Sequence, residues 1–235
     1  MDIQKINDIE IKPITKTKKK NKVIPDPLCD PHAERPFLYI ISSKTGSGKS
    51  VLISNILKNI YYHYFNNVYF CSSNVDNGMI YDVAYDKVKI SDKRIFDTFN
   101  EEIMEYIVND IRSDEDFEDS QYLLIIDDLP TELNKRTSRI VKHFLKHRHI
   151  HLSIIIVTQK LNLLNTAVRG NATHLISFFT NNKKERETMT EMTDNDNFLK
   201  YLDYATQEPY NFLFVDLLRN PAKFYKNFNT ELKIN

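Results

Sequence analysis

Ser43-Lys44-Thr45-Gly46-Ser47-Gly48-Lys49-Ser50 is the stretch of sequence that decides the fold. It follows an apolar run at residues 37–42, which we expect to be a buried strand. It leads into residues 49–62, which we expect to be a helix because apolar side chains recur there at helical spacing. Except at its first position, where serine stands in place of glycine, the stretch fits the pattern G-x-x-x-x-G-K-[ST]. A strand, a glycine turn and a helix in this order predict a phosphate-binding loop.

The residue types in this loop suit a nucleoside triphosphate. The chain has only four glycines, and Gly46 and Gly48 both lie here, where the backbone must approach phosphate oxygens closely. The loop amides and the N-terminus of the following helix attract phosphate. We expect Lys49 to reach the β- and γ-phosphates and the Ser50 hydroxyl to bind Mg²⁺. All residues of the stretch 43–50 are expected to form the ATP site.

Two carboxylates follow a strongly apolar run later in the chain, Leu123-Leu124-Ile125-Ile126-Asp127-Asp128. A buried strand of this kind lies in the middle of a sheet, and its C-terminal end is where ligands bind in open α/β sheets. We expect Asp127 to hold Mg²⁺ and Asp128 to polarise the attacking water. Many motor ATPases have glutamate at the second position, so the shorter Asp128 is a departure from that pattern.

A polar side chain follows the next apolar run, residues 152–158. Gln159 stands directly after this run. A polar group at this strand end can contact the γ-phosphate or the attacking water, so we count Gln159 among the catalytic candidates. Read alone, it is equally a glutamine in an exposed loop.

The remaining pattern predicts an α/β fold with a mainly parallel sheet and helices on both faces, because apolar strands alternate with amphipathic helices. Two apolar runs around Arg219-Asn220-Pro221 predict a C-terminal hairpin that extends the sheet. Residues 74–100 are ambiguous. The further expected strands are residues 68–72 and 174–180, the expected helices are residues 101–111, 135–146 and 183–192, and the hairpin strands are residues 212–218 and 222–228.

Two regions differ in composition. Residues 1–35 are rich in lysine and proline, which predicts a flexible basic tail, and residues 36–235 are expected to form the ATPase domain. The chain has zero formal net charge, which is not the overall basic signature of a protein that coats nucleic acid. Its two cysteines are expected to be free thiols. We find no stretch suited to a membrane span or a secretory signal, and expect an intracellular, soluble protein.

Together, the motifs around Lys49, Asp127-Asp128 and Gln159 resemble the FtsK–HerA superfamily of DNA-pumping ATPases. More narrowly they are similar to the poxvirus-type genome-packaging ATPases of large DNA viruses and virophages. Lys146-His147-Arg148-His149 and Val168-Arg169-Gly170-Asn171-Ala172 are also similar to segments of that family.

The resemblance implies a RecA-like (ASCE) P-loop fold with strand order 5-1-4-3-2 and a homo-oligomeric ring with active sites shared between subunits. It implies ATP and Mg²⁺ as cofactors, double-stranded DNA bound without sequence specificity, and a capsid or portal protein as a further partner. The expected location is the host cytoplasm or viral factory, or the virion. An arginine from a neighbouring subunit is implied at the site, with Arg148 the first candidate and Arg169 the second. Lys142, Lys146, Lys160 and the N-terminal lysines are candidate DNA contacts.

Other functions remain open at this stage. Asn182-Lys183-Lys184-Glu185 echoes the guanine-reading motif of GTPases, although Glu185 replaces the aspartate that binds the base. An ATPase of another branch, such as a helicase or loader, would have the same nucleotide site. A scaffold that binds ATP without hydrolysing it, or a small-molecule kinase, is the remaining alternative.

Overall fold

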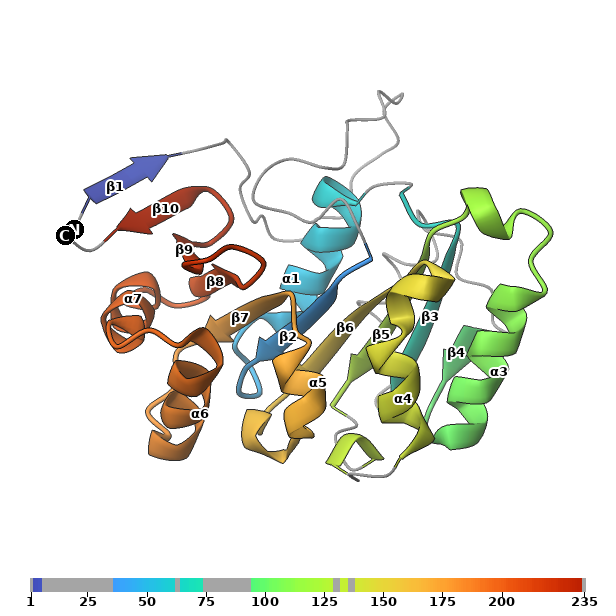
Figure 1. Cartoon of the computed structure of the whole chain (residues 1–235). Helices are drawn as coiled ribbons and strands as arrows, with labels where there is room; N and C mark the ends of the chain where they lie inside the picture. The colour runs from blue at the N-terminus through green and yellow to red at the C-terminus, as the bar shows by residue number, and fades with distance from the viewer. Residues whose placement is uncertain are drawn as a thin grey trace.

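The strand that precedes the phosphate loop lies at the centre of a sheet to which the described residues contribute ten strands (Figure 1). The structure, a computed structural model, describes residues 2–5, 36–61, 64–73, 94–128, 132–134 and 138–233. Strand β2 (Leu38–Ser42) pairs in parallel with β6 (Leu152–Thr158) on one side and β7 (His174–Phe178) on the other. The phosphate loop therefore begins at the C-terminal edge of the central strand.

The parallel part of the sheet has the strand order that the family resemblance implies. Beyond β6 lie β5 (Tyr122–Asp127), β3 (Asn67–Ser72) and the short β4 (Ile95–Phe96), all parallel. Counted along the chain without β4, the order β7-β2-β6-β5-β3 is 5-1-4-3-2, as expected. Because these strands are parallel, their C-terminal ends share one edge of the sheet.

Antiparallel strands extend the sheet beyond β7. The expected hairpin is present as β8 (Phe212–Asp216) and β9 (Lys223–Lys226), with β8 pairing against β7. Two strands that the sequence analysis did not predict follow, β10 (Thr230–Lys233) and β1 (Asp2–Lys5). The flexible tail predicted for residues 1–35 therefore contains a segment that forms β1. Residues 6–35 lie outside the described residues.

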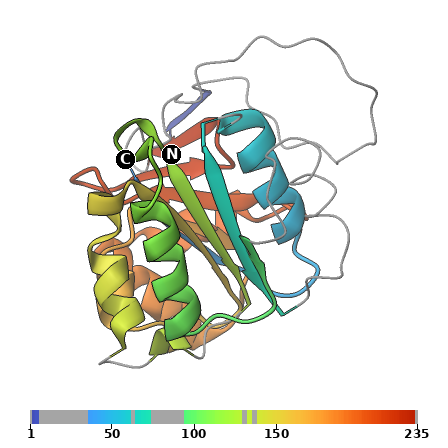
Figure 2. The same cartoon turned by 90° about the vertical axis from the view of Figure 1, so that its right-hand side faces the viewer.

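Helices cover both faces of the sheet, as expected. Figure 2 shows the sheet edge-on, with α1 on one side and the green and yellow helices on the other. Helix α1 (Lys49–Asn55) continues as a π-helical turn, Ile56–Ile60, so the expected helix over residues 49–62 changes its hydrogen bonding midway. The opposite face carries α3 (Glu101–Arg112), α4 (Arg139–Leu145), α5 (Thr166–Gly170), α6 (Lys183–Thr193) and α7 (Phe198–Ala205).

Alternate strand residues build two separate cores. Leu38 and Ile40 of β2 face α3 to α7, whereas Tyr39 and Ile41 face α1. Every residue of β2, β5 and β6 is buried, which is the pattern of strands covered on both faces. These cores hold the ends of β2, β5 and β6 in place, and the candidate site is built on those ends.

Some expected boundaries were wrong. Helix α4 begins at Arg139 and not at residue 135, because the Ser138 hydroxyl accepts a hydrogen bond from the Ile140 amide and caps the helix there. Residues 135–137 lie outside the described residues. Strand β7 ends at Phe178, two residues before the predicted end at residue 180. The short helices α5 and α7 were not predicted. No helix among the described residues has the length and apolar character needed to cross a membrane.

His147 makes the stability of the fold dependent on pH. Its side chain is buried and its Nδ1 donates a hydrogen bond to the Leu152 carbonyl over 2.6 Å. Burial lowers the pKa of His147, more than the hydrogen bond raises it, and the neighbouring Arg148 lowers it further. The folded protein therefore keeps this imidazole neutral at pH values where the unfolded chain has already bound a proton.

We expect the free energy of unfolding to fall as the pH is lowered below about 6.5, the ordinary pKa of histidine. The unfolded chain binds more protons than the folded one in that range, so acid favours unfolding. Urea unfolding at pH 8 and pH 6 measures the change. His147→Gln should show a smaller pH dependence than the wild type, whereas the exposed His149→Gln should match it. An equal pH dependence in all three proteins would contradict this origin.

Candidate nucleotide-binding site

The phosphate loop leaves β2 in a conformation that requires glycine. Gly46 has φ 80° and Gly48 has φ 95°, both in the left-handed region that disfavours residues with a Cβ atom. Gly48 is also the N-cap of α1, and a Cβ atom there would lie 3.2 Å from Cδ1 of Tyr210. The scarcity of glycine elsewhere in the sequence therefore correctly indicated a backbone requirement at this turn.

Serine is accommodated at the first position of the loop. The Ser43 amide donates to the Thr158 carbonyl over 3.1 Å, which ties the start of the loop to the end of β6. Ser43 is not among the described residues with a left-handed backbone. The departure from the glycine pattern therefore leaves the turn intact.

The loop lysine lies against both carboxylates. Lys49, in the first turn of α1, has its Nζ 3.5 Å from Asp127 Oδ1 and 4.0 Å from Asp128 Oδ2. Asp128 has φ 60°, and its amide donates to the Val157 carbonyl over 3.1 Å. This bond extends the contact between β5 and β6 by one residue and turns the Asp128 side chain toward Gln159.

Gln159 contacts Asp128 directly. Its Nε2 donates to Asp128 Oδ2 over 2.5 Å. The sequence placed these residues on neighbouring strand ends, and the structure joins them by a hydrogen bond. Gln159 is thus able to orient the carboxylate that we expect to polarise water.

Asp127 has the surroundings of a metal ligand. Apart from the ion pair with Lys49, its buried Oδ1 accepts no hydrogen bond from the described residues. Burial raises the pKa of Asp127, Lys49 lowers it, and Asp128 raises it again. Mg²⁺ binds one or two carboxylates together with substrate phosphates. Asp127 and the hydroxyl of Ser50, in the first turn of α1, are the hard oxygen donors that fit this ion.

The rest of the loop is held by a bond to the segment after β7 and by a bond within the loop. Lys44 Nζ donates to Asn181 Oδ1 over 3.0 Å, and Ser47 Oγ donates to the Lys44 carbonyl over 2.7 Å. Thr45 is exposed at the tip of the loop. Asn181 was not among the predicted site residues, because an asparagine after a strand carries no distinguishing pattern.

The GTPase-like motif has a structural use. Asn182 caps α6 by accepting a hydrogen bond from the Glu185 amide, and the buried Glu185 carboxylate accepts one from the Leu161 amide over 2.8 Å. Asn182 is therefore occupied in capping α6 and Glu185 in joining α6 to the loop after β6, and their geometry gives no support to guanine recognition.

Neither candidate arginine lies at the site of its own chain. Arg148 is exposed in the turn His147–Ile150, which precedes β6, whereas Gln159 follows it. The seven residues of β6 separate them by about 20 Å, at roughly 3.3 Å per residue. Arg169 lies in α5, ahead of β7, and donates to Thr166 Oγ1 over 3.4 Å. Either arginine could act only on the site of another subunit.

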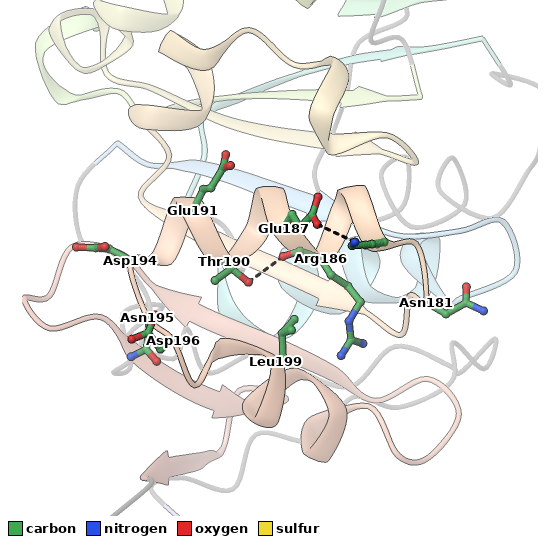
Figure 3. Close-up of a pocket in the computed structure, with 10 residues that line it drawn as sticks. Asn181, Arg186, Glu187, Thr190, Glu191, Asp194, Asn195, Asp196 and Leu199 are labelled. Carbon is green, nitrogen blue, oxygen red and sulfur yellow. Dashed lines mark hydrogen bonds and ion pairs between the residues drawn. The ribbon is translucent and has the colours of Figure 1, made fainter.

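A hollow along α6 and α7 lies close to Asn181 but does not suit phosphate. It encloses about 690 Å³ between the helices (Figure 3). Arg186 lines it, but its guanidinium is held by both oxygens of Asp203, over 2.7 and 2.8 Å. The acidic residues in its lining are Glu187, Glu191, Asp194 and Asp196. Of the two basic side chains in the lining, Arg186 is held by Asp203 and Lys183 lies 3.8 Å from Glu187, so the lining is mainly acidic and disfavours a triphosphate.

Solved structures share this fold. The genome packaging NTPase B204 of Sulfolobus turreted icosahedral virus 2, in complex with ATP-gammaS, is 18% identical with a TM-score of 0.61, over 82% of this chain and 98% of that one. The DNA-packaging ATPase B204 of Sulfolobus turreted icosahedral virus is 22% identical with a TM-score of 0.63, again over 82% of this chain and 98% of that one. The pCW3 conjugation coupling protein TcpA is 15% identical with a TM-score of 0.51, over 77% of this chain and 57% of that one.

No curated protein matches the chain at the level of sequence. A family model does match, that of the poxvirus A32 protein, over residues 30–207. The matched residues include the phosphate loop, both carboxylates and Gln159, on which the resemblance to poxvirus-type ATPases rested. Because this match spans most of the sequence, the chain belongs to the poxvirus A32 protein family.

Proposed function

We propose that the protein is an ATPase that drives double-stranded DNA into a viral capsid. The observation that carries this proposal is the meeting of Lys49, Asp127, Asp128 and Gln159 at one edge of the sheet. The family and the packaging ATPases that share the fold support the same function.

The residues divide the chemistry among them. Loop amides and Lys49 hold the β- and γ-phosphates, while Asp127 and Ser50 would hold Mg²⁺, which neutralises charge on the phosphates when bound. Asp128 accepts a hydrogen bond from the attacking water and aligns it with the γ-phosphorus. Gln159, bonded to Asp128, changes partner when the γ-phosphate leaves and so links hydrolysis to movement of the loop after β6.

A ring of identical subunits completes the site. Arg148 lies exposed at the edge of the sheet opposite the phosphate loop, so a head-to-tail neighbour is able to bring it to the ATP of the next subunit. A guanidinium there stabilises the charge that develops on the transferring phosphoryl group. A capsid or portal protein as a further partner, and a location in the host cytoplasm, the viral factory or the virion, follow from the packaging role.

The DNA contact is carried by a basic hollow between α3, α4 and the turn after α4. Its cationic side chains are Arg112, Arg139, Lys142 and Lys146, of which Arg139 is paired with Glu105, and the hollow, which His143 also lines, encloses about 380 Å³. Burial lowers the pKa of His143, and the charges of Arg112 and Lys146 lower it further. Clustered cations of this kind bind the phosphates of a duplex without reading its sequence. Arg148 lies in the turn next to this hollow, so DNA and the neighbouring ATP site would meet at one interface.

Replacing Lys142 and Lys146 with alanine should weaken DNA binding and make it less sensitive to salt. Each lost phosphate contact lowers the slope of log K against log salt by about 0.9, so the double variant should lose about 2. Filter binding between 50 and 200 mM salt is the measurement. Lys183→Ala with Lys200→Ala, two exposed lysines on α6 and α7, is the matched control. An unchanged slope in the first pair would place the DNA contact elsewhere.

ATP turnover with and without double-stranded DNA tests the proposed function. We expect DNA to stimulate hydrolysis in the wild type and Lys49→Ala to abolish it. Hydrolysis that is indifferent to DNA would favour another branch of ATPases. ATP binding without hydrolysis at any protein concentration, with DNA present, would instead favour an ATP-binding scaffold.

A further inference from the structure

The site fixes the orientation of a bound nucleotide, because the side chains that we expect to be catalytic lie on only one side of the central strand β2. Asp127, Asp128 and Gln159 come from β5 and β6, to one side of β2. The terminal phosphate must face them. A nucleotide bound to the loop therefore extends across Gly46 and Ser47 toward β7 and β8, on the other side of β2.

A hollow lies on that side of the loop. It encloses about 630 Å³, a size typical of small-molecule sites. It is bounded by the loop itself, by the end of β7 and by the segment that leads into β8. The lining residues that matter here are Gly46, Ser47, Phe178, Phe179, Tyr210 and Asn211.

Two aromatic side chains in this hollow are open to solvent. Tyr210 is 71% exposed and Phe179 is 56% exposed, the highest values among the large apolar side chains that the structure describes. They come from segments far apart in sequence, yet both line the same space beside the phosphate loop. Tyr210 lies against the loop, since its ring approaches the position of a Cβ atom on Gly48 to 3.2 Å.

The backbone that presents Tyr210 is held in place. Tyr210 has φ 66°, an uncommon conformation for an aromatic residue. Beside it, Asn211 donates to Glu208 Oε2 over 2.8 Å and accepts from Asn227 Nδ2 over 3.1 Å. The Phe212 amide donates to Asn227 Oδ1 over 3.2 Å. These bonds keep the segment before β8 beside the phosphate loop with the tyrosine ring turned outward.

The charges around the hollow are compensated. Asp203 is bound by Arg186, and the Glu208 carboxylate lies 3.8 Å from Lys226 Nζ. The acidic side chains of the lining therefore present little net charge to a nucleotide whose phosphates are bound at Gly46 to Ser50. Uncharged groups therefore remain for recognition, and the most exposed apolar ones are the faces of Phe179 and Tyr210.

We infer that this hollow binds the purine base of the nucleotide, with Tyr210 stacked on the base and Phe179 forming the adjoining wall. The inference rests on the proposed binding of a nucleoside triphosphate at the loop. Aromatic stacking tolerates different bases, because every base has a π-face. The site should therefore prefer the larger face of a purine over a pyrimidine and discriminate only weakly between adenine and guanine.

The test compares ligands with and without a base. Isothermal titration with Mg²⁺ measures the affinity for ATP, CTP and inorganic tripolyphosphate in the wild type and in Tyr210→Ala, Tyr210→Phe and Phe179→Ala. We expect Tyr210→Ala to weaken ATP binding about 10-fold while tripolyphosphate binding stays unchanged, and Tyr210→Phe to keep wild-type affinity. Tyr106→Ala, a tyrosine 44% exposed on α3, is the control and should change nothing.

The outcomes separate the base site from the phosphate site. Unchanged ATP affinity in both Tyr210→Ala and Phe179→Ala would overturn the base site and leave the proposed function intact. Equal losses for ATP and tripolyphosphate would show that Tyr210 only supports the loop, which also overturns it. A wild type that binds neither ligand, or a Lys49→Ala variant that binds both normally, would contradict the proposed function itself.

Discussion

Arg148→Ala is expected to lower DNA-stimulated ATP turnover by about 10³–10⁵-fold while the affinity of each subunit for ATP stays unchanged. The side chain is exposed and lies at the far end of β6 from the phosphate loop, so its loss leaves the fold and the site of its own chain intact. The defect arises only where a neighbour reaches the γ-phosphate. Steady-state turnover together with nucleotide titration separates the two effects.

Mixing inactive variants tests whether the arginine acts between subunits. A ring of Lys49→Ala and Arg148→Ala subunits contains interfaces where an intact loop faces an intact arginine. At equal amounts, turnover should recover to about one quarter of the wild type, if interfaces form at random and work independently. Recovery of no activity, with mixed rings shown to form, would contradict a shared site. Arg169→Ala is the comparison. A larger loss of turnover in Arg169→Ala than in Arg148→Ala would mean that Arg169 is the arginine supplied to the neighbouring site.

Asp127→Asn is expected to lower turnover by about 10²–10³-fold without lowering the stability of the free protein. Because burial raises the pKa of Asp127, the ionised carboxylate opposes folding at neutral pH, and a neutral amide of the same shape removes that cost. The thermal midpoint of the variant in EDTA should therefore equal or exceed that of the wild type. The stabilisation added by Mg²⁺ with ATP should be lost.

Asp128→Asn is the matched control for this experiment. It leaves Asp127 and Ser50 in place, so Mg²⁺ with ATP should still raise the thermal midpoint, while turnover falls because the water is no longer polarised. Opposite behaviour of the two variants would exchange the roles that we assign to the carboxylates. Identical behaviour would mean that both bind the ion.

The sequence by itself determined the class of fold and the centre of the site. A glycine turn between a strand and a helix, and carboxylates after an apolar strand, are local patterns whose geometry follows from a few neighbouring residues. Such patterns predicted the loop at residues 43–50, the ends of β5 and β6, and the parallel sheet that brings those ends to one edge. The order of the strands came from the resemblance that these motifs carry.

Only the tertiary structure decided which distant residues meet. The bond between Gln159 and Asp128 and the approach of Tyr210 to Gly48 depend on how separate strands align, which no local pattern encodes. The separation of Arg148 from the site of its own chain likewise follows from the direction of β6. Strand β1 was missed because a polar edge strand is stabilised by its pairing with β10 and not by an apolar pattern of its own.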